Sequence, residues 1–420
     1  MNTQKRFTAL DSTRGAAMLF VCLAHFADVF FNGASPLTDL MSSMSHKIGK
    51  VGTPTFVILS GLVLGYLFKS KGEQFEASRV HLVDRALALL IIGHVLIVAC
   101  IVTKLGLSVG MRIAIVTDMI ALCVILGSLV IKVTPFYSRI ILGLAVYVTS
   151  WIAVVAWNPE QRLLLMVKAI TVGEVPFSSI GTGSAFPFPI FFPILPWFAV
   201  YILSSCLGER IASLYHNGMK QTAHRSLFKI GGLMLSIGLT LKMIQELFFH
   251  FHVLETESII SALMYPSQKF PPGVSYVLVY GGTGLLLTSF FLHIEAAGLL
   301  RRVSEAMRTV GQASMGVYTA QFFIYYTVFS LLVSHTNLAP LYLWPVYWLA
   351  SLYLLFKFAQ FWNRAGLQSF LSVGYPFLRQ PISVYSARQL EPQTDGNGIC
   401  ETTPRGHRPQ RRVAHKDHAA

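Results

Sequence analysis

An arginine and a histidine stand in the first apolar segment of the chain, and their types and spacing suit group transfer. The segment reads LDSTRGAAMLFVCLAHF and contains Arg14 and His25. Ionisable side chains are costly inside a membrane helix, by ~2.5 to 3.5 kcal/mol for Arg, and therefore indicate functional sites. Eleven residues make about three helical turns, so Arg14 and His25 share one face, about 16 Å apart along the axis. Asp11, one turn before Arg14, is within reach of an ion pair.

Two roles are open for each of these side chains. His25 can act as a general base that takes a proton from a hydroxyl or amino group near neutral pH. It can instead carry an acyl group as a covalent intermediate. Arg14 can hold the phosphate oxygens of a nucleotide-containing donor, or it can be the structural partner of Asp11, and its several N–H donors allow both. We predict that His25 is catalytic and that Arg14 binds the donor.

Two residues on neighbouring predicted helices are further candidates. Arg85, at the start of the third predicted helix, can extend to the inner membrane surface or meet the same donor as Arg14. Ser60 stands beside Gly61 and near Gly65 in the second predicted helix. The glycines favour close helix packing, whereas Ser60 can also face a substrate cavity.

Polar residues in two later helices have both a structural and a functional interpretation. Asp118 opens the fourth predicted helix, either as an interfacial anchor or as part of the site. Ser314, Tyr318 and Gln321 follow one another at three- and four-residue steps, so they form one polar seam. Such a seam suits a substrate-facing wall or plain interhelical hydrogen bonds. The histidines and cysteines show no metal-ligand spacing, and we predict no metal.

Composition identifies an integral membrane protein. The chain has 420 residues, of which 54% are hydrophobic and only 12% charged, whereas soluble domains have about 25% charged residues. Ten apolar runs approach the ~20 residues that a spanning helix needs. They cover residues 10–31, 49–68, 86–103, 112–131, 138–157, 189–208, 227–249, 274–293, 311–333 and 340–362. We therefore predict an all-α, polytopic fold of about ten transmembrane helices, or eleven if residues 160–180 also enter the membrane.

The distribution of Lys and Arg predicts the orientation. Basic residues are denser in the predicted loops 69–85, 132–139, 208–226 and 294–310 than in the alternate loops. Because cytoplasmic loops carry the excess of Lys and Arg, both termini are expected in the cytoplasm. Arg14 then lies near the cytoplasmic end of its helix, and His25 lies deeper.

The end of the chain is a separate, basic segment. We divide the chain into a transmembrane domain, residues 1–363, and a cytoplasmic tail, residues 364–420. After about residue 389 the tail is polar, rich in Pro and Gly and without apolar periodicity, which is typical of disorder. Much of the formal charge of +14 lies here, so the charge favours contact with lipid headgroups over nucleic-acid binding, and we predict no nucleic-acid partner.

Several motifs resemble two related families of membrane acyltransferases. The pair Arg14 and His25, with its surrounding sequence, resembles the opening signature of the acyltransferase-3 family and of the heparan-alpha-glucosaminide N-acetyltransferase catalytic domain family. The run TPTFVILSGLVLGYLF resembles the second helix of both families, and VGQASMGVYTAQFF resembles a late helix of both. Three further runs are more similar to bacterial proteins of the heparan-acetyltransferase type: TDMIALCVILGSLV, FPILPWFAVYILSSCLGER and FPPGVSYVLVYGGTGLLL.

The resemblance implies an activity and a set of roles. It implies an acyl donor such as acetyl-CoA, used from the cytoplasm, and a saccharide-type acceptor on or near the other face. It implies His25 as the catalytic group, and Arg14, with Arg85, at the donor; Asp11, Ser60, Asp118, Tyr318 and Gln321 are supporting candidates. Many relatives have a histidine where this chain has Gln321, which counts against a second catalytic histidine.

The sequence thus predicts a multi-pass acyltransferase of the bacterial inner membrane that modifies a cell-envelope carbohydrate. Two alternatives remain open from the sequence. One is a transporter or flippase of envelope precursors, in which Arg14 and His25 form a relay without acyl transfer. The other is a sensor or scaffold that acts through its basic tail. The acceptor, the acyl length, N- or O-acylation and the oligomeric state are not specified by the sequence.

Overall fold

The computed structural model describes residues 8–31, 35–105, 113–173, 192–251, 263–264, 269–331 and 343–367. All of these residues belong to one compact unit, residues 1–378. The predicted tail beyond residue 367 lies outside the described residues, so the predicted division at residue 363 stays a prediction.

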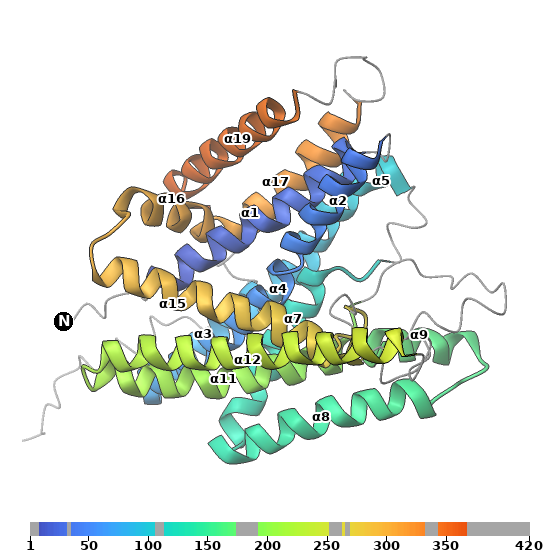
Figure 1. The fold of residues 1–420 in the computed structure, drawn as a ribbon. Coiled ribbons are helices and arrows are strands. Elements are labelled where there is room, and N and C mark those ends of the chain that lie inside the picture. Colours follow the sequence, from blue (N-terminus) through green and yellow to red (C-terminus); the bar gives the residue numbers. More distant parts are fainter. Residues whose placement is uncertain are drawn as a thin grey trace, which may run out of the picture. The chain divides into compact units, whose positions relative to one another are not determined.

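The described part of the chain is helical and contains no β-strand (Figure 1). In chain order the helices are α1 (Thr8–Phe30), α2 (Pro36–Gly49), α3 (Gly52–Lys71), η1 (Gly72–Gln74), α4 (Phe75–Ala88), η2 (Leu89–Gly93), α5 (His94–Leu105), α7 (Val116–Val133), α8 (Phe136–Ala156), α9 (Arg162–Thr171), α11 (Ile194–His216), α12 (Lys220–His250), α14 (Val274–Tyr276), η4 (Val277–Gly281), α15 (Gly282–Ala296), α16 (Arg301–Gln312), α17 (Ser314–Phe322), η5 (Phe323–Phe329) and α19 (Trp344–Arg364). Three of them, η2, η4 and η5, are π-helical and continue the α-helices beside them.

The helices confirm an all-α, multi-pass membrane protein. Among the described residues, 7 helical stretches are long and apolar enough to cross a membrane: Thr8–Phe30, Pro36–Cys100, Val116–Val133, Phe136–Ala156, Ile194–His216, Lys220–Phe248 and Val274–Ala297. The stretch Pro36–Cys100 includes α3 and most of α5, which correspond to the predicted runs 49–68 and 86–103. The last two predicted runs coincide with α17 and η5 and with α19, which are helical but are not among the 7. The cytoplasmic placement of the termini stays a prediction.

Several segments predicted as loops are helices. Helix α4 occupies most of 69–85, most of α16 falls in 294–310, and only residues 217–219 separate α11 from α12. These helices carry many charges but still bury small apolar faces, for example Phe75 and Ala86 of α4 and Val310 of α16. Charge density therefore did not locate the ends of the helices. Helix α9, in the possible eleventh span, has 10 residues, fewer than the ~20 needed to cross a membrane.

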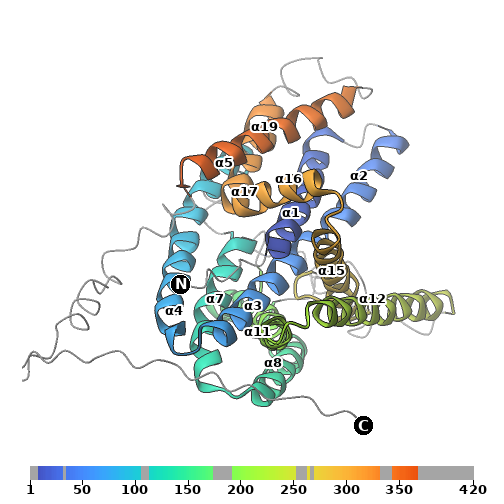
Figure 2. The same ribbon diagram turned by 90° about the vertical axis from the view of Figure 1, so that its left-hand side faces the viewer.

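Helix α1 crosses α16 at close range because a glycine stands on each side of the contact (Figures 1 and 2). A Cβ atom on Gly311 would lie 1.8 Å from the backbone oxygen of Asp11, and one on Gly15 would lie 1.9 Å from that of Met307. The two backbones are thus in direct contact, and neither glycine can be enlarged unless the helices separate.

Hydrogen bonds fix the same half of α1 in rotation. The carboxylate of Glu295, from α15, accepts bonds from Thr8 Oγ1 at 2.7 Å and from Ser12 Oγ at 3.1 Å. Ser304 of α16 donates to the same carboxylate at 3.1 Å. Together with the glycine contact, this network sets the direction in which Arg14 projects.

Helix α3 packs most extensively against α11, also through small residues. A Cβ atom on Gly61 would lie 2.2 Å from the backbone oxygen of Tyr201, and one on Gly65 would lie 1.8 Å from that of Ser205. The prediction that these glycines allow close helix approach is confirmed. The fully buried Trp197 and Tyr201 of α11 belong to the core around α3.

Aromatic rings hold the second half of α1. Phe26 lies 5.3 Å from the ring of Trp348 in α19, and 6.0 and 6.2 Å from the rings of Tyr325 and Phe329 in η5. This cluster connects α1 to the two C-terminal helices. It leaves the opposite side of α1, with His25, facing the cavity described next.

Candidate active site

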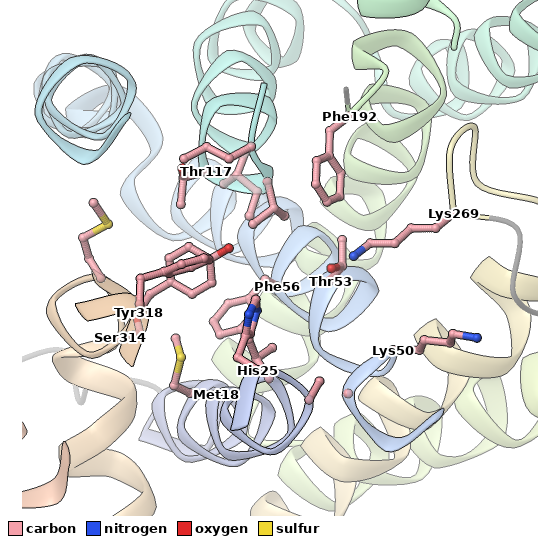
Figure 3. A pocket seen from close by; sticks show the side chains of 18 of the residues that line it. Met18, His25, Lys50, Thr53, Phe56, Thr117, Phe192, Lys269, Ser314 and Tyr318 are labelled. Atoms are coloured by element: carbon pink, nitrogen blue, oxygen red, sulfur yellow. The ribbon is translucent and has the colours of Figure 1, made fainter. Parts of the chain in front are cut away.

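A cavity of about 910 Å³ lies between α1, α3, α17 and η5. Further parts of its wall come from the α2–α3 junction, from residues 113–120 and from two aromatic residues, Phe192 and Phe270. Figure 3 shows Phe192 on the wall, with Thr117 of the second of these segments. Its volume suits a drug-sized or larger ligand. The site residues predicted from the sequence are therefore expected on its wall.

The wall formed by α1 is a single stripe. Arg14, Met18, Val21, His25 and Asp28 all line the cavity, and they recur at three- and four-residue steps, which places them on one face of the helix. From the first to the last, the stripe rises about 21 Å along the axis. Arg14 and His25 thus lie on the wall of the same cavity, as their spacing predicts, with Asp28 one turn beyond the histidine.

His25 belongs to a hydrogen-bonded chain that ends on a carboxylate. Its Nδ1 atom lies 2.8 Å from the hydroxyl of Tyr326 in η5, and that hydroxyl donates to Oδ2 of Asp28 at 2.7 Å. Nδ1 itself is 3.9 Å from the same oxygen. On the other side of Asp28, Nε2 of His46, at the end of α2, lies 3.3 Å from Oδ1.

The chain of donors determines the tautomer of His25. An ionised carboxylate can only accept, and a tyrosine has a single hydroxyl proton. Because Tyr326 gives this proton to Asp28, its oxygen accepts from Nδ1–H of His25. The lone pair of the neutral imidazole is then on Nε2, and Asp28 can stabilise the imidazolium through Tyr326. A histidine held in one tautomer by a carboxylate is suited to general-base catalysis.

The ring of His25 is also held by packing. It lies 4.8 Å from the ring of Phe322, in a tilted arrangement, and 5.6 Å from that of Tyr326, edge to face. Its side chain keeps 23% of its accessible surface. His25 is thus ordered by its neighbours yet reachable from the cavity.

The two arginines predicted at the donor lie in different surroundings. Arg14 lines the cavity, and its Nη1 atom is 3.7 Å from Oδ1 of Asp11. Asp11 is buried and stands behind Arg14 without lining the cavity. Arg85 is exposed near the end of α4 and is not part of the cavity wall. The structure thus brings Arg14 and Asp11 together with His25 and leaves Arg85 apart.

Two of the four remaining candidates line the cavity. Ser60 lines it from α3. Tyr318 lines it from α17, next to Ser314 (Figure 3). Gln321 is fully buried outside the wall, and neither atom of its amide has a hydrogen-bond partner within the described residues. The predicted polar seam is therefore split, with Ser314 and Tyr318 at the cavity and Gln321 in the packed interior.

Asp118 belongs to a second histidine–carboxylate pair. Its Oδ2 atom lies 2.8 Å from Nδ1 of His94, at the start of α5, and accepts from the backbone N–H of Ile115 at 3.0 Å. Asp118 is the third residue of α7, and its buried carboxylate binds the backbone N–H of Ile115, the residue that precedes the helix, as in a capping box. Asp118 is not part of the cavity wall, although the neighbouring Thr117 is. Its position matches the anchoring interpretation more closely than the catalytic one.

Sequence reasoning missed Asp28, Tyr326, Thr53 and Lys269, all on the cavity wall. Asp28 had a signal in the sequence, because a carboxylate three residues after a histidine lies beside it on a helix. Tyr326 and Lys269 had none, since they reach the site only through the packing of η5 and of the segment before α14. These residues add a carboxylate, a hydroxyl relay and a cation to the predicted pair.

Comparison with known proteins gives the class of the molecule. The helices are those of a multi-pass membrane protein, and His25 stands half-buried on the wall of their cavity. A family model described as heparan-alpha-glucosaminide N-acetyltransferase, catalytic, matches residues 6–237. The chain belongs to this family, as the motifs around Arg14 and His25 predicted. No curated protein matches the chain.

Proposed function

We propose that the protein transfers an acetyl or other short acyl group from acyl-CoA to a hydroxyl or amino group of a saccharide acceptor, with His25 as the general base. We place it in a bacterial inner membrane, with the donor entering from the cytoplasm. The proposal rests above all on one observation: His25 stands on the wall of a large cavity, hydrogen-bonded through Tyr326 to Asp28. Family membership supports the class of reaction.

In the proposed step, Nε2 of His25 removes a proton from the acceptor hydroxyl or amino group. The freed oxygen or nitrogen attacks the thioester carbonyl, a new C–O or C–N bond forms, and the C–S bond breaks. The CoA thiolate leaves and takes the proton from the imidazolium. Asp28 stabilises that imidazolium through Tyr326 while the proton is held there.

Arg14 lies about 16 Å from His25 along α1, which suits a donor whose phosphates and thioester are separated by a long arm. Its guanidinium can bind phosphate oxygens while Asp11 holds it from behind.

Replacement of Arg14 by Gln is expected to raise KM for acetyl-CoA roughly 10-fold, because a charge-assisted contact to phosphate is lost. The value of kcat should change less. Arg302→Gln, an exposed change on α16, is the matched control and should leave KM unaltered. An unchanged KM in the Arg14 variant would refute its role at the donor.

The function is tested on the purified full-length protein in lipid nanodiscs. Release of the CoA thiol from acetyl-CoA is followed with and without amino sugars and neutral sugars, and the acetylated product is identified by mass spectrometry. Acceptor-dependent release is the expected result. If the protein moves a labelled glycolipid across the bilayer but releases no thiol, the transporter alternative is correct and the proposal fails.

Removal of the Tyr326 hydroxyl in Tyr326→Phe should lower kcat by roughly 10-fold to 100-fold, because a base misplaced by about 1 Å can lose this much. KM for the donor should stay constant, since Tyr326 lies away from Arg14. The neighbour Tyr325 is the control: it is fully buried and bonds Ser351 instead, at 3.1 Å. Tyr325→Phe should keep kcat. Equal losses in both variants would indicate that the hydroxyl of Tyr326 only supports packing.

A further inference from the structure

A lysine outside the matched family region reaches into the cavity. Lys269 stands before α14, and its Nζ atom lies 4.8 Å from the ring centroid of Phe192 and 5.2 Å from that of Phe270. The two rings are themselves packed edge to face, with centroids 4.7 Å apart. Aromatic faces attract a cation and hold it in place. Figure 3 shows the side chain extending toward Thr53, on the opposite side of His25 from Ser314 and Tyr318.

The segment that carries Lys269 is anchored to the helices around it. The carbonyl of Pro272 accepts a bond from the hydroxyl of Tyr147 at 2.7 Å and one from Nε1 of Trp151 at 3.3 Å. Ser275 donates to the carbonyl of Gly238 at 2.9 Å. The ammonium group of Lys269 is thus presented from a fixed backbone, as a preorganised binding group requires.

The charges at this end of the cavity favour an anion. Lys50, at the α2–α3 junction, and Lys269 both line the cavity, and within the described residues no carboxylate forms an ion pair with Lys269. Asp28, the carboxylate on this part of the wall, is bonded by Tyr326 and lies beside His46. A negatively charged ligand would relieve the repulsion between the two lysines.

Lys269 lies outside the membrane-spanning helices, and its ionisation is perturbed. Burial, and to a smaller degree the positive charge of Lys50, lower the pKa of Lys269 to about 8, while Asp28 acts in the opposite direction. The ammonium is therefore charged at neutral pH, but an anion beside it would stabilise the charged form further.

We propose that Lys269, with the hydroxyl of Thr53 beside it, binds a negatively charged group of the acceptor, a carboxylate or a phosphate, and so directs the acceptor to His25. This inference rests on the proposed function. The position of the lysine supports it: Arg14 occupies the early end of the α1 stripe, His25 lies about 16 Å further on, and Lys269 lines the same cavity as His25 and Asp28. A donor held at Arg14 leaves this second cation for the other substrate.

The test uses acceptors that differ in one charged group. Glucosamine 6-phosphate is compared with glucosamine, and glucuronate with glucose, for the wild-type protein and for Lys269→Gln, Lys269→Arg and Lys47→Gln. Lys47 is exposed near the same junction but does not line the cavity, so it is the matched control. Wild-type kcat/KM should be higher for the charged member of a pair, and Lys269→Gln should lower that value roughly 10-fold to 100-fold while sparing the neutral member.

Further comparisons identify whether the acceptor or the donor supplies the negatively charged group. Lys269→Arg should retain the preference, and Lys47→Gln should not change it. If Lys269→Gln instead raises KM for acetyl-CoA but not for the donor without its 3′-phosphate, the lysine binds the donor and the proposal is wrong. Equal losses for charged and neutral acceptors would overturn it as well.

Direct binding separates this inference from the proposed function. Titration calorimetry with glucosamine 6-phosphate and glucosamine needs no turnover. If the wild-type protein binds the phosphorylated sugar more tightly and Lys269→Gln loses this preference, the subsite is supported even when the protein releases no CoA. If an active protein shows no such preference, the subsite is wrong and the proposed function still holds. In the active protein, the preference in kcat/KM should decline as the pH rises through about 8, because Lys269 then loses its charge.

Discussion

A His25→Gln protein is expected to transfer acetyl groups roughly 10² to 10⁴ times more slowly than the wild type. Glutamine keeps a polar side chain of similar size that can still bond Tyr326, but it cannot accept and return a proton. The loss should appear in kcat, because Arg14 and the rest of the cavity wall remain in place. Thiol release from acetyl-CoA measures the rate, and gel filtration with thermal unfolding verifies that the variant is folded.

His81→Gln is the control for this experiment. His81 is exposed on α4 and does not line the cavity, so its replacement should keep the wild-type rate. Turnover of His25→Gln at the control rate would end the proposed mechanism. Detection by mass spectrometry of an acetyl group attached to His25 would replace the general-base route with the covalent one.

A single methyl group at the crossing of α1 and α16 is expected to destabilise the protein strongly. In Gly311→Ala the new Cβ atom would lie 1.8 Å from the backbone oxygen of Asp11 and 2.9 Å from the backbone nitrogen of Gly15. Both contacts are with backbone, which cannot rotate away as a side chain can. Overpacking costs about 1 to 3 kcal/mol in ordinary cores, and we expect at least the upper end of this range here.

Gly232→Ala gives the opposite expectation and so serves as the matched control. Gly232 lies in α12, and nothing stands within 4 Å of a Cβ atom built there. Alanine in an open helical position stabilises a protein by about 0.4 to 1 kcal/mol. The melting temperature in one detergent should therefore fall for Gly311→Ala and stay constant or rise for Gly232→Ala. Equal melting temperatures would show that α1 and α16 can separate at little cost.

Much of the fold could be predicted because apolar length and small residues act locally. The runs at 10–31 and 138–157 became α1 and α8, and Gly61 and Gly65 do bring α3 against α11. The polar helices were predicted as loops, because their burial depends on helices that are distant in the sequence. Helix α16, for example, is predominantly polar, and its contact with α1 through Gly311 is visible only in three dimensions.

The site was predictable only where one helix carries it. Arg14 and His25 lie eleven residues apart on α1, and helical periodicity alone places them on a common face. Tyr326 is separated from His25 by 301 positions in the sequence, and no periodicity connects them. Arg85 illustrates the converse: its charge and its neighbourhood made it a donor candidate, but its helix directs it to the exterior.

The π-helical stretch η5 has a consequence for the comparison of this chain with its relatives. A π-helix bonds each residue to the fifth along, and so holds more residues per turn than an α-helix does. Deletion of one residue would let the segment return to regular α-helical bonding. It would also rotate the residues after the deletion by about 100° about the helix axis, relative to the residues before it. Tyr326 would then leave His25. Insertion or deletion of a single codon in this segment can therefore create or abolish the hydrogen bond between Tyr326 and His25, without any change in the codon for His25.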